Sequence, residues 1–216
     1  MTVEVTRGSE DLVGRYFVAQ QRRPKGIGEL GVGELEPFLR SLLFTDGTVT
    51  RALAVQLLAP VSVKPVSQEE VAVPADVAAH LETDAGQSSI RRRTAIGAGS
   101  KTLLWAESHL LPERLPDGFF GALRGAPDGI GQSLQQAALE NYRELLWFGL
   151  DQLPGWASAR DGVATVRRLY RLVSEGKASI LISESFLVER QGGAYRLAGL
   201  DESCLDGELP GTGGGE

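Results

Sequence analysis

The chain has 216 residues, of which 42% are hydrophobic and 23% charged, the balance of a globular domain with one sizeable core. Its formal net charge of -6 argues against a surface for nucleic acid or anionic membranes, because such a surface needs a clustered basic excess. No apolar run has the length of a signal-peptide core or of a membrane span, so we expect a cytoplasmic protein. The single cysteine, Cys204, excludes an internal disulfide framework.

Little regular structure is predicted before residue 34. The segment LVGRYFVA could form a strand, and QRRPKGIGELGVGE is typical of a mobile loop. We therefore expect residues 1–33 to form an N-terminal extension that is partly flexible. The first clear helix is predicted over residues 34–44, with Pro37 in the tolerated first turn. Its apolar residues recur at helical spacing, namely Leu35, Phe38, Leu39, Leu42 and Leu43.

An ordered segment, two helical patterns and an edge strand are predicted around the middle of the chain. Asp46-Gly47 breaks the first helix, and TVTRALAVQLL resumes an ordered segment. VSVKPV alternates as a strand, and Pro65 places it at a sheet edge or a strand end. A short helical piece is expected at residues 119–123. A second long helix is marked by Leu134, Ala138, Tyr142, Leu145 and Leu146.

Two strand pairs complete the pattern. Residues 89–99 and 101–112 are predicted to be adjacent strands joined by a turn at Gly97 to Ser100. ATVRRLYRLV and ASILISESFLV, joined by SEGK, form the clearest hairpin. Strands with helices inserted between them predict an α+β fold, with a single antiparallel sheet and flanking helices. We expect this domain to span residues 34–200, followed by a disordered Gly-rich tail at residues 201–216.

Glu184 is the most conspicuous candidate for chemistry. In a strand it shares a face with Ile180, Ile182, Phe186 and Val188, so its carboxylate should point inward. A desolvated carboxyl group is suited to proton transfer near neutral pH.

A structural role for Glu184 is equally compatible with the pattern. Pairing Val173 with Ala178 across the turn would place Glu184 opposite Arg167, as a structural ion pair.

Three consecutive arginines form the second candidate. Alternation places Arg91 and Arg93 on one face of their strand and Arg92 on the other, with Thr94 and Ile96. An inward arginine needs an anionic partner, and a substrate carboxylate matches its planar fork. Such a run is also compatible with a solvated strand surface that carries one structural salt bridge.

Three other kinds of site have little support. GIGELG matches the pattern G-x-G-x-x-G of dinucleotide-binding sites. It follows a basic turn instead of a buried strand, so a loop is expected. The two histidines, His80 and His109, are not spaced as metal ligands, so no metal site is predicted. Ser183 and Ser185 lack the Gly-x-Ser-x-Gly turn of serine hydrolases.

Five segments carry a family resemblance, namely FLRSLLFTDGTVTRAL, RRRTAIGAGSKTLLWAESHLLPERLP, IGQSL, QLPGW and RRLYRLVSEGKASILISESFLV. They occur in the order and spacing of chorismate pyruvate-lyases, and the chain resembles that family from about Pro37 to Arg190. The resemblance is strongest to the branch that supplies 4-hydroxybenzoate for phenolic glycolipids.

This resemblance implies a buried site beneath helical flaps that converts chorismate to 4-hydroxybenzoate and pyruvate without metal or cofactor. It implies an essential arginine at Arg93 and an essential glutamate at Glu184, within the pattern L-x-x-E-x-F-L. Arg91, on the predicted face of Arg93, is a further candidate for substrate binding. The flap positions over the ligand correspond to Val49 and to Ile130-Gly131.

Two alternatives stay open at this point. The same fold resembles effector-sensing domains of transcription regulators, which bind a ligand without turnover. The segment before Pro37 is expected to be too short and too acidic for the DNA-binding domain that accompanies them. A lyase-like enzyme acting on another acid in secondary metabolism is the second alternative.

Overall fold

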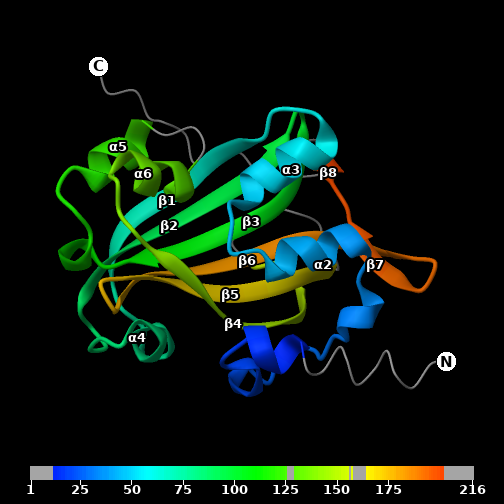
Figure 1. Ribbon diagram of the computed structural model, residues 1–216, viewed down its shortest axis with the longest axis horizontal. Coiled ribbons are helices and arrows are strands. Elements are labelled where there is room, and N and C mark those ends of the chain that lie inside the picture. The colour runs from blue at the N-terminus through cyan, green and yellow to red at the C-terminus, as the bar shows by residue number, and fades with distance from the viewer. Residues whose placement is uncertain (1–11, 126–128, 156, 158–163, 202–216) are drawn as a thin grey trace.

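The computed structural model describes residues 12–125, 129–155, 157 and 164–201. Its centre is one antiparallel sheet of eight strands in the order β1-β2-β3-β6-β5-β4, with β7 paired to β6 and β8 paired to β3 (Figure 1). The strands are β1 (Ser62–Ala72), β2 (Ser88–Ala98), β3 (Lys101–Leu110), β4 (Tyr142–Gln152), β5 (Ala164–Ser174), β6 (Lys177–Gln191), β7 (Ala194–Leu197) and β8 (Leu200–Asp201).

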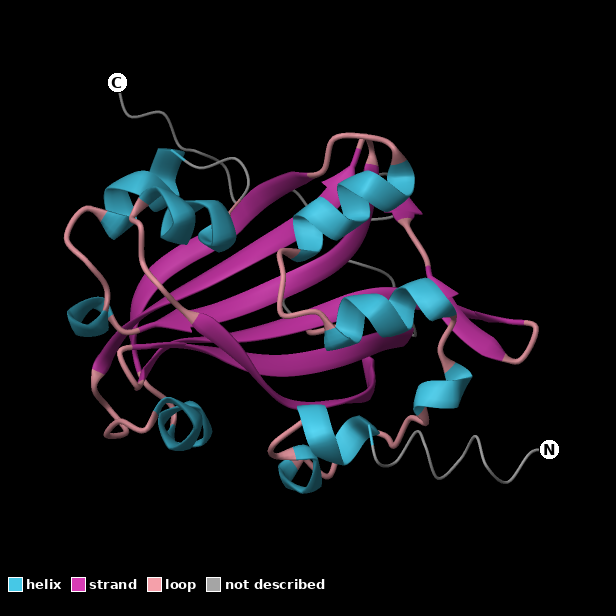
Figure 2. Ribbon diagram, in the orientation of Figure 1, coloured by secondary structure: helices cyan, strands magenta, loops and turns pink. Residues whose placement is uncertain are grey.

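Helices flank this sheet on both faces (Figure 2). One face is covered by α2 (Pro37–Phe44), α3 (Val49–Leu57), α5 (Phe119–Gly125) and α6 (Ile130–Gln136), which contribute to the main core. α4 (Ala75–Leu81) packs on the opposite face, where its Leu81 joins Leu169 and Leu181 in a second apolar cluster. We call the first side the helix face and the second the α4 face. The expected α+β fold is confirmed.

The main core lies on the helix face, because alternation along the strands directs apolar side chains there. β6 contributes Ile180, Ile182, Phe186 and Val188, which confirms the predicted inward face of this strand. α2 buries Leu39, Leu42 and Leu43 against them and begins with Pro37, whose fixed φ suits the first helical turn.

The strand pairs are confirmed with small irregularities. β2 and β3 form the expected hairpin, as do β5 and β6. β1 is an edge strand, and its register shifts between Pro65 and Ser67, as expected for a residue that donates no backbone hydrogen bond. In the described part of the chain, no helix is long and apolar enough to cross a membrane.

The predicted second long helix is wrong. α6 ends at Gln136, and Tyr142 begins β4 instead. Leu145 packs into the main core and Leu146 into the cluster on the α4 face. A strand buried on both faces has an apolar run that periodicity cannot distinguish from a buried helix.

The N-terminal segment also differs from expectation. Residues 12–16 are helical, and Phe17 makes a parallel bridge to Leu145. The predicted loop packs on the protein, because Ile27, Leu30 and Val32 are buried. The predicted tail beyond residue 201 lies outside the described residues.

Candidate functional site

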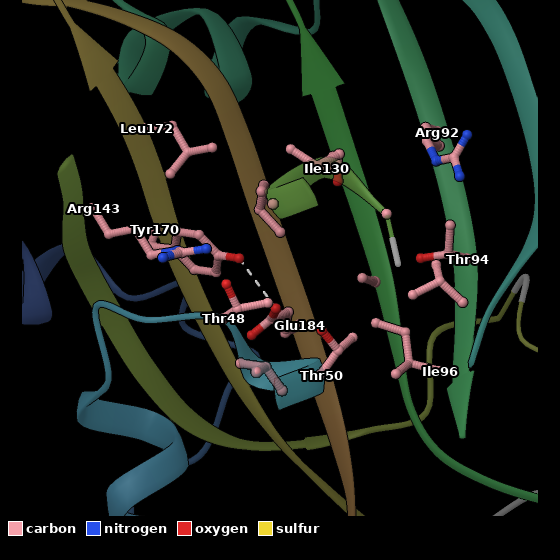
Figure 3. Close-up of a pocket in the computed structure, with 17 residues that line it drawn as sticks. Thr48, Thr50, Arg92, Thr94, Ile96, Ile130, Arg143, Tyr170, Leu172 and Glu184 are labelled. Carbon is pink, nitrogen blue, oxygen red and sulfur yellow. Dashed lines mark hydrogen bonds between the residues drawn. The ribbon is translucent and has the colours of Figure 1, made fainter. Parts of the chain in front are cut away.

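A cavity of about 70 Å³ lies between the helix face of the sheet and the beginnings of α3 and α6. Strands β2, β3, β5 and β6 form its floor, and residues 48–50 and 129–131 cover it (Figure 3). Small-molecule pockets usually measure about 300–1,000 Å³, so a ligand requires the covering segments to move apart.

Glu184 lies in this cavity with its side chain almost completely buried. The Nε of Arg168 donates a hydrogen bond to Oε2 of Glu184 over 2.7 Å. The hydroxyl of Tyr170 donates to the other carboxylate oxygen over 3.1 Å. These two donors fix the orientation of the carboxylate from the side of β5.

Arg168 is itself held by the end of α2. Its Nη1 donates to the carbonyl oxygens of Leu42, Leu43 and Thr45, at 2.6, 3.0 and 3.2 Å. The last carbonyls of a helix carry partial negative charge, so a cation is stabilised there. Arg168 therefore connects Glu184 rigidly to α2.

The ion-pair partner predicted for Glu184 was wrong by one residue. Val173 does pair with Ala178, but a bulge follows, and Leu172 pairs with Ile180. The extra residue in β6 brings Arg168 opposite Glu184. Arg167, on the α4 face, pairs instead with Asp151 over 2.9 Å.

Tyr170 is a hydrogen-bond donor in this site. Burial raises the pKa of its hydroxyl far above the usual value, and the charge of Glu184 raises it further. The hydroxyl therefore keeps its proton at physiological pH and donates a hydrogen bond to Glu184.

The arginine triplet alternates as predicted, but the inward residue is Arg92. Arg92 lines the cavity, together with Thr94 and Ile96. Arg91 lies on the α4 face, paired with Glu69 over 2.8 Å. The expectation that Arg91 and Arg93 point inward is wrong, because Ile96, an apolar residue of the main core, shares the face of Arg92.

Arg93 also lies on the α4 face. Its Nε contacts Oε2 of Glu107 on β3 over 2.6 Å, and both side chains are partly exposed. The structure therefore does not bring Arg93 together with Glu184.

Arg92 is buried beside a neutral partner. Its Nη1 donates to the side-chain oxygen of Gln68 over 2.9 Å, and the residue is 5% exposed. Burial lowers the pKa of Arg92 from its usual value, although an arginine remains charged in proteins. Among the described residues, no carboxylate lies within ion-pair distance of Arg92, so its positive charge is available to an anionic ligand.

The predicted flap residues Val49, Ile130 and Gly131 all line the cavity. Val49 begins α3 and Ile130 begins α6, so both covering segments are helix N-termini. A Cβ on Gly131 would lie 3.4 Å from the side chain of Thr48. The two covering segments therefore touch above the cavity, and a glycine allows their close approach.

A larger outer cavity of about 680 Å³ adjoins the first, between α3 and α6. The two cavities share Thr48, Gly131 and Arg143 as lining residues. The guanidinium carbon of Arg143 lies 5.7 Å from the ring centre of Tyr170, and its Nη1 donates to the carbonyl of Asp46. These shared residues mark the route between the buried cavity and the surface.

Sequence reasoning missed Arg92, Arg143, Arg168 and Tyr170 as members of this site. Arg168 and Tyr170 lie two residues apart, in register with the apolar Val166 and Leu172. This spacing could have placed them on the inner face of the strand. Arg143 could not be found, because its segment was assigned to a helix.

Comparison with known proteins places the chain in a family. Residues 43–191 match the model of a family described as "Chorismate pyruvate-lyase Rv2949c-like". The chain belongs to this family. The chorismate pyruvate-lyase of Mycobacterium tuberculosis is 27% identical over 169 residues, covering 74% of this chain and 85% of the relative. The protein of that name from Mycobacterium bovis matches to the same extent.

Solved structures support the same fold for this chorismate pyruvate-lyase family member. The effector domain of PhnF from Mycobacterium smegmatis superposes with a TM-score of 0.54 at 11% identity, covering 66% of this chain and 90% of that domain. A second PhnF structure gives a TM-score of 0.53 at 12% identity, covering 67% of this chain and 65% of that one. At this identity the likeness shows the fold alone.

Proposed function

We propose that this protein is a chorismate pyruvate-lyase, which eliminates pyruvate from chorismate and leaves 4-hydroxybenzoate. The observation that carries the proposal is the pair of opposite charges in the closed cavity. A buried carboxylate, Glu184, faces a space that also holds Arg92, a buried cation without a carboxylate partner among the described residues. Family membership supports the same reaction.

The reaction is an elimination that makes the ring aromatic. The bond between ring carbon C3 and the ether oxygen breaks, and the oxygen leaves with its electron pair as enolpyruvate. The proton on C4 is removed, and its bonding electrons complete the aromatic ring. Enolpyruvate takes up one proton and becomes pyruvate. No electrons are gained or lost overall, so the reaction needs no redox cofactor.

In this proposal Glu184 transfers the proton and Arg92 binds the substrate. Arg92 holds the ring carboxylate, because a guanidinium matches a carboxylate with two parallel hydrogen bonds. Glu184 accepts the C4 proton and returns a proton to enolpyruvate. This assigns to Arg92 the role that the sequence reading gave to Arg93, whose guanidinium is bound to Glu107 on the other face.

The covering segments hold the reactive conformer and exclude water. Val49, Ile130 and Gly131 contact the ligand in the closed state, and Gly47 and Gly131 adjoin the moving segments. The product 4-hydroxybenzoate binds where chorismate binds and leaves only when these segments open, so it inhibits the enzyme competitively.

The test is to incubate the purified protein, treated exhaustively with EDTA, with chorismate. We expect 4-hydroxybenzoate and pyruvate in equal amounts, with competitive inhibition by added 4-hydroxybenzoate. Turnover that disappears with EDTA and returns with a divalent ion would contradict the mechanism. Absence of turnover under all conditions would contradict the function.

A second candidate is a ligand-binding domain without turnover. The observation that favours it is the ion pair of Glu184 with Arg168, which gives the carboxylate a structural role. In that case the protein binds 4-hydroxybenzoate or a similar aromatic acid in a calorimeter, releases no pyruvate from chorismate, and keeps its affinity when Glu184 is replaced by Gln.

A further inference from the structure

Arg143 is a second arginine at the cavity that pairs with no carboxylate of the described residues. Its Nη1 donates to the neutral carbonyl of Asp46, and its guanidinium lies over the ring of Tyr170 and interacts with the neutral hydroxyl of that residue. Its Nε is buried and has no acceptor. The next residue, Glu144, bonds to Arg171 on the α4 face and is not available to it. A positive charge thus remains uncompensated beside the cavity.

Arg92 and Arg143 lie on opposite sides of Glu184 (Figure 3). Glu184 is on β6, Arg92 on β2 and Arg143 on β4, and the sheet order places each arginine two strands from β6. The strand register places Arg92 level with Ile182 and Arg143 level with Ile180, so both lie on the face of Glu184 but further along the strands. The side chain of Arg143 extends to the ring of Tyr170, whereas the guanidinium of Arg92 bonds to Gln68 on β1. The site therefore has two cations with one proton-transferring group between them.

We propose that Arg143 binds the second carboxylate of the substrate, the one on the enolpyruvyl side chain, so that the site selects dicarboxylates. This inference rests on the proposed function for the identity of the substrate. Chorismate carries two carboxylates, one on the ring and one on the ether substituent, and the bond that breaks lies between them. Two cations on either side of Glu184 bind both ends of such a molecule and hold the reacting carbons beside the carboxylate.

The position of Arg143 also determines the order in which the two products leave. Arg143 lines both the inner and the outer cavity, whereas Arg92 lines only the inner one. Cleavage leaves one carboxylate on each product, with pyruvate at Arg143 and 4-hydroxybenzoate at Arg92. Pyruvate therefore lies at the outer cavity and leaves first, and 4-hydroxybenzoate remains inside until the flaps open.

The experiment compares Arg143→Met with Arg143→Lys, Arg92→Met and the unchanged protein. Arg143→Met should raise KM for chorismate about 10- to 100-fold, the loss typical of a charge-assisted hydrogen bond. The Kd for 4-hydroxybenzoate, measured by calorimetry, should stay within about twofold, because the product lacks the second carboxylate. Arg143→Lys should recover part of the loss, and Arg92→Met should weaken both ligands.

A matched control is Arg190→Met, which removes an exposed arginine far from the cavity, paired with Glu34 over 3.8 Å. It should leave both constants unchanged. Circular dichroism and thermal melting establish that each variant is folded. Added pyruvate should inhibit the unchanged protein competitively, and Arg143→Met should lose this inhibition.

Two results would overturn the inference while leaving the proposed function intact. One is turnover by Arg143→Met with unchanged KM. The other is an equal loss of affinity for chorismate and for 4-hydroxybenzoate, which would mean that Arg143 only shapes the cavity.

If the unchanged protein does not turn over chorismate, the proposed function fails, and the inference is then decided by binding alone. Chorismate should bind more tightly than 4-hydroxybenzoate to the unchanged protein, and Arg143→Met should remove that preference. Equal affinities in the unchanged protein would overturn the inference.

Discussion

The two faces of the sheet use arginine in different ways. On the α4 face, arginines pair with carboxylates on neighbouring elements, as in Arg91–Glu69, Arg93–Glu107 and Arg167–Asp151. On the helix face, Arg92 and Arg143 bond only to neutral oxygens, and Arg168 pairs with the buried Glu184. The arginines of the α4 face are therefore neutralised by carboxylates of the protein itself. The two arginines at the cavity have no such carboxylate, so their charge is suited to binding an anionic ligand.

Exposure to solvent determines how much each ion pair contributes to the stability of the protein. The side chains of Arg167 and Asp151 are 29% and 20% exposed, and ion pairs with that access to water are typically worth about 0–1 kcal/mol. Arg168 and Glu184 are 0% and 6% exposed, and removing one partner of a buried pair typically costs about 3–5 kcal/mol. The comparison therefore predicts large effects on the helix face and small ones on the α4 face.

The largest effect is expected from Glu184→Gln. Gln keeps the size of the side chain but cannot take up a proton, so kcat for chorismate should fall about 10²- to 10⁴-fold. Steady-state kinetics measure the loss, with circular dichroism to verify folding. Full activity in Glu184→Gln, together with unfolding of Glu184→Ala, would show that the carboxylate only partners Arg168.

Arg168→Met should reduce the free energy of unfolding by about 3–5 kcal/mol, because it leaves the carboxylate of Glu184 buried without its cation. Arg167→Met, one residue earlier on the other face, should cost at most about 1 kcal/mol. Urea denaturation compares the two. The double variant Arg168→Met, Glu184→Met should recover stability relative to Arg168→Met, and its failure to do so would assign the cost to packing instead of charge.

Arg92→Ala should weaken 4-hydroxybenzoate binding about 10- to 100-fold, as expected for the loss of a buried charge-assisted pair. Arg93→Ala, on the other face, should change this affinity by less than about twofold. Calorimetric titration of both variants decides the matter. The reverse order would show that the ligand carboxylate binds on the α4 face.

The smallest effect concerns the two histidines of the α4 face. Burial is the main cause that lowers the pKa of His80 and of His109 below 6.5, opposed by Asp76 for both and by Glu107 for His109. The unfolded chain then binds more protons than the folded one as pH falls through about 6.5, so stability decreases in that direction. His109→Gln should make this dependence shallower in urea titrations between about pH 7 and 5.5. An unchanged slope would contradict the burial effect.

Local pattern was sufficient for most of the sheet. The alternation in ASILISESFLV predicted that Glu184 would share a buried face with Ile182 and Phe186, and the structure agrees. The turn at residues 174–177 and the pairing of Val173 with Ala178 were also predicted from short-range chemistry. The flap positions Val49 and Ile130-Gly131 came from family resemblance, and the structure places them over the cavity.

By contrast, the partners of Glu184 could not be predicted from the local sequence, because they depend on a strand bulge and on long-range contacts. One extra residue in β6, between Ala178 and Ile180, exchanged Arg167 for Arg168. The side chain of Arg168 is held by carbonyls more than 120 positions away in the chain. Periodicity alone could not identify β4, because a strand buried on both faces has no alternation, so Arg143 was missed.

The sequence by itself determined the strand faces, the main hairpins and the presence of an inward carboxylate, because side-chain alternation is a property of each strand. The tertiary structure decided which arginine faces Glu184 and which arginines stay unpaired. Those outcomes depend on strand register and on which face the helices cover, and both are set by packing between segments distant in the chain.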